Sequence, residues 1–480
     1  MSQLDAAEHL ETTASFVNSG VGAPLRDGCG WSVVSLFAGC GGLDFGFKEL
    51  NFDLVYACDS DPAAVACYRH NVDPRIEQRD VNTTAFIEDL RRLPRCDVVV
   101  GGFPCQGFSK AGPKREEDER NSLYLRMRQA VEILRPRLFL AENVDGIEQN
   151  YEGIFVKRIR QGFTFENVAY DVDYRVLDAH AFGVPQYRRR AFFVGRRRPN
   201  LRPFAWPVPT HERRDRNGEF KVASDPPLFT TSSWAERLPP PQTIRDAIED
   251  LQQLDPSIPD HAVTNNWPTH YEHVIRRIGS GQKLCNVRHS PTSVYTWQVP
   301  EAFGVVSSRE QLVLETISRH RRHKKYGNIP NGNPLPIPVI ELLSGLREIA
   351  PEIESLLSKN YLKPVNNGYD LKGAMFCSGL FKRPQWDEPS PTVLTNFHNP
   401  RYFLHPSENR PFTLRECARL QSFDDSFEFL AAGVSLLDGY RLVGNAVAPK
   451  VGRAFAVAFC QELLAIECEG ATSEYGRLSS

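Results

Sequence analysis

The chain reads SVVSLFAGCGGL at residues 32–43, and this stretch decides the expected fold. Its first half is short, apolar and ended by glycines, which predicts a buried strand at 32–38. Helical spacing follows over 42–50. Glycines between a strand and a helix let the backbone approach a ligand closely at the helix N-terminus. The G-x-G-G spacing alone is a weak signal, because a tight turn without a ligand or a nicotinamide enzyme would use similar glycines.

Strands and helices alternate onward from this turn. Further elements are expected as strands at 52–58, 97–101 and 137–141, a β–α unit at 75–92, and helices at 61–71 and 121–134. The helix at 61–71 would begin with Asp61 as N-cap and Pro62 in its first turn. This alternation predicts an α/β domain at 30–200, built on a mostly parallel sheet with helices on both faces.

The composition and patterning of the sequence change near residue 200. Proline-rich stretches such as PFAWPVPT and PNGNPLPIP appear without a clear strand–helix repeat, which indicates a second, smaller and irregular domain at 201–440. Helical periodicity returns in the segment 441–470, where we expect a C-terminal helix. The ends of the chain, 1–29 and 471–480, are expected to be tails, the first of them disordered.

Composition limits the class of protein. The 480 residues contain no apolar run long enough to span a membrane, and the polar N-terminus does not resemble a signal peptide. The 11 cysteines include no C-x-x-C pair and no zinc-ligand spacing, so we expect reduced thiols in a cytoplasmic compartment and no metal. The net charge of −2 does not exclude nucleic acid, because a local basic face is what binds phosphates.

Acidic residues stand at the ends of the second and third expected strands, at Asp59 and Asp80. The ends of parallel strands meet at one edge of a sheet, and an acid after the second strand can accept hydrogen bonds from a ribose. Together with the glycine turn, these strand ends fit an adenosine-type ligand.

A cysteine follows the apolar strand at 97–101. Residues 101–109 read GGFPCQGFS, so Cys105 lies outside the C-terminal end of a strand, where parallel sheets present active sites. Most lone cysteines are small buried hydrophobes. That interpretation suits Cys58 and Cys96, but it is poor for Cys105, which lies between proline and glutamine in a polar loop.

Six elements together resemble the cytosine-C5 DNA methyltransferase family, of the prokaryotic restriction-modification type. They are FAGCGG at 37–42, GGFPCQGFS at 101–109, ENV at 142–144, QYRRR at 186–190, RECARLQ at 415–421 and GNAV at 444–447. They occur in the family's order, and the similarity covers about 32–198 and 387–455. One such match could be chance, but six in sequence are a strong signal.

The resemblance implies a Rossmann-like, S-adenosylmethionine-dependent fold and methyl transfer to C5 of cytosine in a specific double-stranded DNA sequence. Cytosine C5 becomes nucleophilic only after a group adds at C6, and a thiolate is suited to that addition. The resemblance gives this role to Cys105 and places Glu142 at N3 of the base. A carboxyl in a closed pocket tends to hold a proton. The base must flip out of the duplex to be reached.

Two arginines complete the expected catalytic set. Arg188 and Arg190 alternate on a probable strand, so they should point to one face, while Arg189 points to the other. The resemblance places the first face at the active site, where a guanidinium can bind O2 of cytosine or a phosphate.

The resemblance also assigns residues to the cofactor and the DNA. The cofactor set is Phe37, Gly39, Gly41, Gly42, Asp59, Asp80, Val81, Pro104 and Asn445. The substrate and DNA set is Gln106, Ser109, Asn143 and Gln186, with Asn143 also holding the local turn. The polar stretch at 106–122 is expected to be a mobile loop that closes over DNA.

Three positions depart from the family's pattern. Asp59 replaces a residue that is often Glu, which puts the ribose contacts in doubt. The usual Gly-Asp-Ile reads Arg79-Asp80-Val81, without the turn glycine, and Ala448-Pro449-Lys450 is a mild variation after GNAV. None of these changes involves Cys105 or Glu142.

The domain at 201–440 corresponds to the family's target-recognition region. No single residue in it stands out as base-reading, because candidates are too numerous. Its basic run SRHRRHKK at 318–325 suggests a phosphate contact, and we expect Arg321 and Arg322 to contribute to DNA affinity without reading sequence. The resemblance also implies that the C-terminal helix packs back on the first domain.

Other classes of function fit less well. A tRNA cytosine-C5 methyltransferase would carry a Cys-Phe-Thr signature, and the nearest text is MFCS at 375–378. A non-catalytic DNA-binding module would have lost Cys105 or Glu142. A nicotinamide oxidoreductase lacks its third spaced glycine, and an amino-methylating enzyme would need a Pro-Pro-Tyr/Phe motif in place of FPCQ.

Partners and location follow from the resemblance. We expect double-stranded DNA as the substrate, a cognate restriction endonuclease that shares the target sequence, and a monomer in the prokaryotic cytoplasm, associated with the nucleoid through DNA. The amino-acid sequence does not indicate the DNA target sequence or the general base that removes the C5 proton.

Overall fold

The computed structural model describes residues 30–103, 123–149, 154–199, 202–214 and 238–478, apart from 252, 256, 264–266, 288, 330–331 and 373–378. The loop expected at 106–122, the N-terminal tail, and Pro104, Cys105, Gln106 and Ser109 lie outside the described residues.

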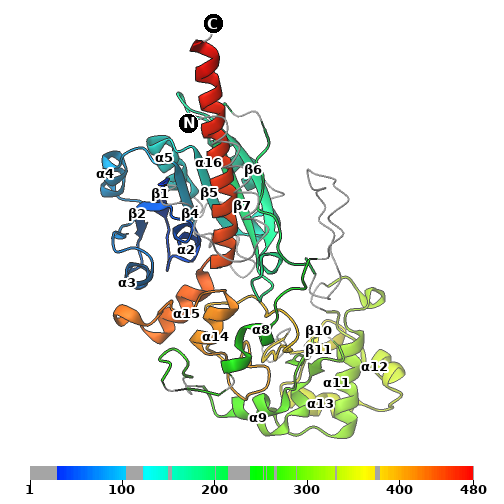
Figure 1. Ribbon diagram of the computed structural model, residues 1–480. Coiled ribbons are helices and arrows are strands. Elements are labelled where there is room, and N and C mark those ends of the chain that lie inside the picture. Colours follow the sequence, from blue (N-terminus) through cyan, green and yellow to red (C-terminus); the bar gives the residue numbers. More distant parts are fainter. Residues whose placement is uncertain are drawn as a thin grey trace. The chain divides into compact units, whose positions relative to one another are not determined.

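A seven-stranded sheet organises the first part of the chain, in the order β3-β2-β1-β4-β5-β7-β6 (Figure 1). Its strands are β1 (Ser32–Leu36), β2 (Asp53–Asp59), β3 (Glu77–Gln78), β4 (Val98–Gly102), β5 (Leu138–Val144), β6 (Tyr170–Asp178) and β7 (Arg189–Arg197). The first five run parallel, whereas β7 is antiparallel to β5 and to β6. The expected mostly parallel α/β sheet is therefore confirmed.

Helices connect the parallel strands, as the alternation predicts. They are α2 (Gly42–Lys48), α3 (Pro62–Asn71), α4 (Thr84–Arg92), α5 (Leu123–Leu134), α6 (Gly146–Gln149) and α7 (Ile154–Gly162). The Asp61 side chain caps α3 by accepting from the Ala63 amide at 3.0 Å, with Pro62 at the first helical position. Under the helices lies a core that includes Val34, Val99 and Phe139, all fully buried.

The chain's last helix, α16 (Pro449–Leu478), packs against α2. Two glycines allow this close approach. A Cβ at Gly46 would lie 2.1 Å from the Arg453 amide nitrogen, and one at Gly452 would lie 2.5 Å from the Leu43 carbonyl oxygen. The helix continues past the end expected at 470, because a glycine such as Gly470 costs only about 1 kcal/mol inside a helix.

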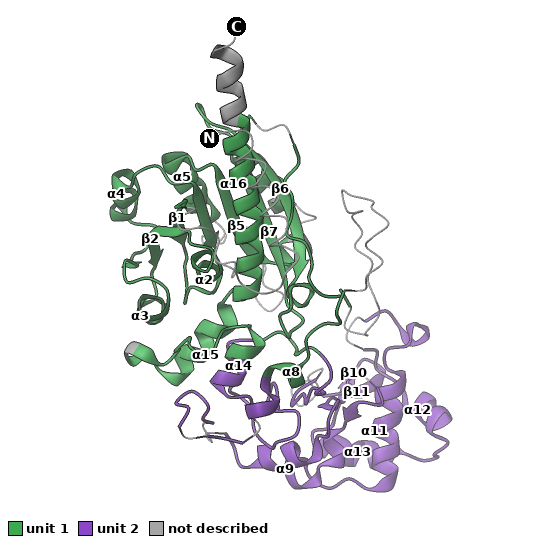
Figure 2. Cartoon of the chain, in the orientation of Figure 1, with its two compact units in different colours: residues 1–247, 389–393, 418–480 green, residues 248–388, 394–417 purple. Residues whose placement is uncertain are grey.

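The chain divides into two compact units (Figure 2). Unit 1 comprises 1–247, 389–393 and 418–480, and unit 2 comprises 248–388 and 394–417. These boundaries differ from the expected 201–440, because flanking segments bind to the first unit.

Four backbone hydrogen bonds show how two of those flanking segments are held. The amides of Thr210 and His211 both donate to the Ala181 carbonyl, at 2.9 and 3.0 Å. The strip 389–393 lies along the start of β7, where the Tyr187 amide donates to Ser390 at 2.8 Å and the Ser390 amide donates to Pro185 at 2.9 Å. Residues far apart in the chain thus complete unit 1.

Unit 2 consists of short elements, as its irregular sequence predicts. Its longer helices are α9 (His270–Arg277), α11 (Ser308–His320), α12 (Ile337–Ser344) and α13 (Ala350–Ser358), with the two-stranded pairs β8–β9 (Lys283–Leu284, Ser293–Val294) and β10–β11 (Leu362–Val365, Gly368–Leu371). In the described part of the chain, no helix is both long and apolar enough to cross a membrane.

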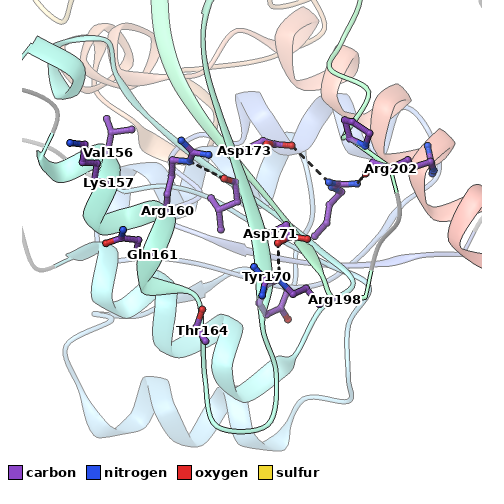
Figure 3. Close-up of a pocket in the computed structure, with 13 residues that line it drawn as sticks. Val156, Lys157, Arg160, Gln161, Thr164, Tyr170, Asp171, Asp173, Arg198 and Arg202 are labelled. Carbon is purple, nitrogen blue, oxygen red and sulfur yellow. Dashed lines mark hydrogen bonds and ion pairs between the residues drawn. The ribbon is translucent and has the colours of Figure 1, made fainter. Parts of the chain in front are cut away.

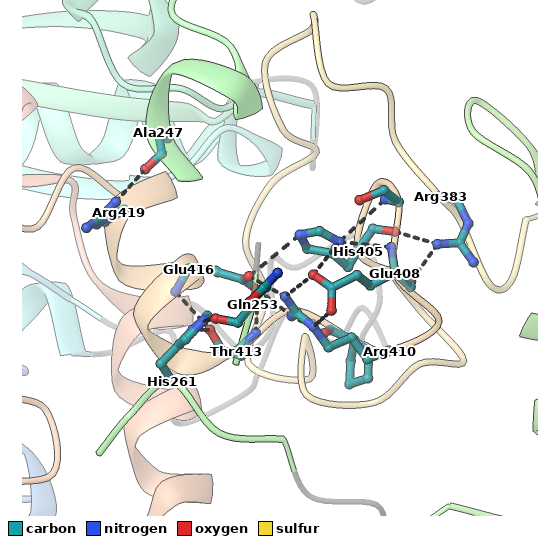
Figure 4. A network of polar contacts seen from close by, with 12 residues as sticks. Ala247, Gln253, His261, Arg383, His405, Glu408, Arg410, Thr413, Glu416 and Arg419 are labelled. Atoms are coloured by element: carbon teal, nitrogen blue, oxygen red, sulfur yellow. Dashed lines mark hydrogen bonds and ion pairs between the residues drawn. The ribbon is translucent and has the colours of Figure 1, made fainter. Parts of the chain in front are cut away.

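A buried polar network stabilises unit 2 (Figure 4). Glu416 is fully buried and accepts from Arg410 at 2.8 Å and from the Thr413 amide at 2.8 Å. His405 lies 3.6 Å from the same carboxylate, and burial lowers the pKa of His405 to about 2, so its ring is neutral. Part of the RECARLQ element therefore has a structural role.

The basic run at 318–325 does not expose all of the side chains that we expected to contact phosphates. Arg321 is buried and forms a paired contact with Asp370, at 2.7 and 2.8 Å. Its guanidinium is therefore unavailable to a phosphate, which corrects the expected DNA contact at this residue. A run of basic residues in the sequence does not show which side chain is buried. The partner of Arg321 lies in β11, far along the chain.

Candidate active site

A cavity of about 620 Å³ opens at the C-terminal ends of β1, β2, β4 and β5. The strands end level with one another, since Leu36 pairs with Gly101 and Gly102 pairs with Glu142. The predicted residues that line the cavity are Phe37, Gly39, Gly42, Asp59, Asp80, Val81, Glu142, Asn143, Arg190 and Asn445. Positions scattered over some 400 residues of sequence are thus brought to one edge of the sheet.

The glycine turn is held from two sides. The Gly39 amide donates to Asp59 Oδ2 at 2.9 Å, and Gly39 and Gly41 have φ of 58° and 92°. A Cβ at Gly42 would lie 2.2 Å from the Val447 carbonyl oxygen. The glycines at 39 and 41 therefore serve the turn, while the glycine at 42 lets the GNAV element pack against it.

Asp59 fits its position despite being shorter than the family's usual glutamate. Its second oxygen accepts from the Asp61 amide at 2.9 Å, so the carboxylate bridges the glycine turn and the start of α3. Burial raises the pKa of Asp59. Asp80 similarly accepts from the Asn82 amide at 2.9 Å.

Glu142 and Arg190 form an ion pair that faces the cavity. Arg190 Nε lies 2.9 Å from Glu142 Oε1. Burial raises the pKa of Glu142, while the positive charges of Arg190 and Arg188 oppose that rise. Arg189 points away, with Nε 3.4 Å from Asp178. The two faces of the strand are as the alternation predicts.

Arg188 has an internal position. It is fully buried and donates to the carbonyls of Val393, Gly444 and Ala446, at 3.1, 3.1 and 2.8 Å. Burial and Arg190 lower the pKa of Arg188. Arg188 therefore connects three segments of the chain through hydrogen bonds. Its effect on Glu142 is electrostatic, because its positive charge lowers the pKa of that carboxyl.

Gln186 also differs from the expectation. Its side chain is fully buried, donates to the Leu420 carbonyl at 2.9 Å and accepts from the Val393 amide at 3.0 Å. A DNA contact would require exposure, so the structure corrects that assignment. Gln186 holds the strip at 389–393 and the end of α14 (Leu414–Leu420) in unit 1.

Asn143 fixes the chain directly after β4. It is almost fully buried, and its Nδ2 donates to the Phe103 carbonyl at 3.1 Å while its Oδ1 accepts from the Val144 amide at 2.8 Å. Phe103 is the last described residue before Pro104 and Cys105. The amide of Asn143 thus fixes the chain just before Pro104 and Cys105.

Several acidic residues of the cavity were not expected from sequence. Asp44 lies in the first turn of α2, and Asp61 pairs with Arg441 of α15 (Leu436–Asn445). Only the N-cap role of Asp61 was visible in the sequence, since Arg441 stands 380 positions further on.

The charges of the cavity suit a cationic ligand. Its acids are Asp44, Asp59, Asp61, Asp80 and Glu142, and its bases are Arg79, Arg190 and Arg441. Each arginine already has an acidic partner, since Arg79 Nε lies 2.7 Å from Asp89. Uncompensated negative charge therefore faces the cavity, and the buried Oδ2 of Asp44 has no hydrogen-bond partner among the described residues.

A second cavity, of about 970 Å³, lies between α7 and the opposite ends of β6 and β7 (Figure 3). Its lining is basic, but acids lie beside the arginines: Arg198 pairs with Asp171 at 2.7 Å, and Arg196 lies 3.9 Å from Asp173. Residues of the predicted site do not line it. The expected chemistry therefore belongs to the first cavity.

Comparison with known proteins finds similar proteins over most of the chain. Residues 31–460 match the family described as C-5 cytosine-specific DNA methylase. The Type II methyltransferase M.AgeI of Thalassovita gelatinovora is 30% identical over 445 residues, which cover 88% of this chain and 97% of that protein. M.HgiBI of Herpetosiphon aurantiacus is 28% identical over 446 residues, covering 87% and 94%. A solved structure, the S. pombe Dnmt2 methyltransferase, aligns with a TM-score of 0.43 at 17% identity, over 90% of this chain and 99% of that one.

Proposed function

The chain belongs to the C-5 cytosine-specific DNA methylase family, and we propose that it binds S-adenosylmethionine in the cavity beside Glu142 and uses Cys105 as its nucleophile. The enzyme transfers a methyl group to C5 of cytosine in DNA. The observation that carries the assignment of residues is the Glu142–Arg190 pair, which faces the cavity next to the end of β4.

The cavity supports the proposed cofactor. S-adenosylmethionine would supply a methyl group carried on a sulfonium cation. Uncompensated acids and an orphaned carboxylate oxygen fit a ligand with that charge. We assign its binding to Phe37, Gly39, Asp59, Asp80, Val81 and Asn445, with Gly41 and Gly42 shaping the turn. Pro104 is assigned to the cofactor through the resemblance alone.

The protein's own groups would act in sequence on a flipped cytosine. The Cys105 thiolate forms a bond to C6, which pushes electrons toward N3 and C5. Glu142 holds a proton at N3, helped by the burial that raises its pKa, and Arg190 orients Glu142 and donates to O2. After methylation a base removes the C5 proton, and the bond from Cys105 to C6 breaks.

Double-stranded DNA is the proposed substrate, and unit 2 is the proposed target-recognition region. Gln106 and Ser109 are assigned to DNA through the resemblance alone. Because the relatives are named as Type II methyltransferases, we also propose a cognate endonuclease that shares the target sequence. A monomer in a prokaryotic cytoplasm, associated with the nucleoid, completes the proposal.

The test combines methyl transfer with adduct trapping. Purified protein would be incubated with radiolabelled S-adenosylmethionine and either genomic duplex DNA or tRNA. Duplexes containing 5-fluorocytosine would trap the thiol adduct, because fluorine at C5 cannot leave as a proton does. Cys105→Ser should abolish both label and adduct, whereas Cys468→Ser, at an exposed thiol, should retain both.

The outcomes separate the substrate from the mechanism. Label in DNA with a Cys105-dependent adduct supports the whole proposal. Label confined to tRNA would keep the mechanism and overturn the substrate. An adduct that persists in Cys105→Ser would overturn the nucleophile.

A further inference from the structure

Asp44 is a buried acid beside the cavity for which the mechanism above has no use. It lies in the first turn of α2, is 1% exposed, and lines the cavity. Within the described residues it has no ion pair, and its Oδ2 has no hydrogen-bond partner. A buried carboxylate without a cation is costly even beside the hydroxyls of Ser35 and Tyr68, so a positive charge on a ligand in the cavity would stabilise it.

The surroundings of Asp44 keep it largely ionised near neutral pH. Burial raises its pKa to about 6, while the hydroxyls of Ser35 and Tyr68 partly offset that rise. Full burial also means that water screens the charge weakly, so it acts on the cavity through a medium of low dielectric constant. Direct contact with a ligand is not needed for such an effect.

The other charged groups that face the cavity are already engaged. Asp61 pairs with Arg441, Glu142 with Arg190, and Arg79 with Asp89. Asp59 accepts two backbone amides, and Asp80 accepts one. Among the described acids of this cavity, Asp44 is the one with a fully buried oxygen that has no hydrogen-bond partner.

We propose that Asp44 is a specificity-determining residue whose negative charge raises the affinity of the cavity for the sulfonium cofactor relative to its thioether product. This inference rests on the proposed function. Methyl transfer removes one positive charge from the cofactor and leaves its adenosine and amino-acid groups unchanged. A cavity shaped for both molecules cannot distinguish them by contact alone, but a nearby buried charge can. Asp44 therefore favours entry of the substrate and release of the product.

The test measures binding of S-adenosylmethionine and S-adenosylhomocysteine by calorimetry, without DNA, at pH 7.5. Asp44→Asn removes the charge with little change of shape. It should lower the ratio of the two affinities by about tenfold, with the loss falling on the sulfonium ligand. Tyr68→Phe, compared with the wild type at pH 8.5, is the matched control. It removes a hydroxyl beside Asp44, and the higher pH keeps the carboxyl ionised despite the loss of a group that lowers its pKa. Its ratio should equal that of the wild type. Asp44→Ser gives the same readout should the asparagine pack poorly.

The outcomes distinguish the two proposals. Equal weakening of both ligands, or an unchanged ratio, in Asp44→Asn would overturn the role of Asp44 while leaving the cofactor site intact. A Tyr68→Phe variant with the same loss would show that packing rather than charge is responsible, and would also overturn it. Wild-type protein that binds neither ligand would overturn the proposed cofactor site itself.

Discussion

Arg190 Nε lies 2.9 Å from Glu142 Oε1, at the point where β7 begins beside the end of β5. The pair balances two opposing effects on one carboxyl. Burial favours the protonated form of Glu142, and the guanidinium favours the charged form. A group held between these limits can keep or share a proton at N3 of a base without being locked in either state.

Arg190→Gln should therefore slow methyl transfer strongly. The variant loses a donor to the base and removes a charge that lowers the pKa of Glu142, and we expect a loss of roughly 10²-fold in the single-turnover rate. The adjacent Arg189→Gln is a matched control, since Arg189 faces Asp178 on the other side of the strand. Equal losses in the two variants would contradict the role of Arg190.

Asn143→Ala should impair adduct formation more than cofactor binding. The side chain fixes the Phe103 carbonyl just before the nucleophile loop, so its loss should misplace Cys105. The rate of trapping on 5-fluorocytosine DNA would be compared with that of Asn71→Ala, which loses similar amide bonds to Cys67 and Glu428 elsewhere in unit 1. Each variant should cost about 1–3 kcal/mol of stability. Trapping that is slowed equally in both would point to a general loss of stability.

Much of the sheet could be predicted because its signals are local. Short apolar runs ended by glycine or acid mark β1, β2 and β4, and Asp61-Pro62 marks the start of α3. The same locality accounts for the strand-end position of Glu142 and for the opposite directions of Arg189 and Arg190, since strand geometry alone decides which faces neighbouring residues share.

The remaining residues depend on partners far along the chain. Gln186 is the first residue of the QYRRR element, yet its contacts with Val393 and Leu420 form only in the folded unit. Arg441 reaches the cavity for the same reason, and nothing in its neighbouring sequence indicates it. Asp44 stands two residues after the glycine turn, but its burial depends on the folded unit. Burial of a polar side chain is a property of the tertiary fold, so motifs alone cannot separate contact residues from supporting ones.

Arg321→Ala should destabilise unit 2 rather than alter the salt dependence of DNA binding. The substitution leaves Asp370 buried without its cation, and breaking such a pair costs about 3–5 kcal/mol. Thermal unfolding should show a lower Tm, whereas Lys324→Ala, at an exposed position of the same run, should leave Tm unchanged. A normal Tm together with a shallower dependence of affinity on salt would restore a phosphate contact for Arg321.

Asp44 should also make the ligand-free protein less stable above pH 6 than its asparagine variant. The folded pKa of about 6 exceeds the ordinary value of 3.8, so the folded state binds the proton more tightly than the unfolded state does. The destabilising contribution of Asp44 is therefore absent below about pH 4, grows as pH rises toward 6, and is complete above that. Its size is roughly 3 kcal/mol, from 1.36 kcal/mol per pKa unit. Thermal unfolding of wild type and Asp44→Asn at pH 4.5, 6 and 7.5 should show a gap in Tm that widens with pH. A difference in Tm that stays constant with pH would mean that the pKa of Asp44 is the same in the folded and unfolded states. Saturating S-adenosylmethionine should narrow the difference in Tm only if the charge of the ligand stabilises the ionised carboxyl.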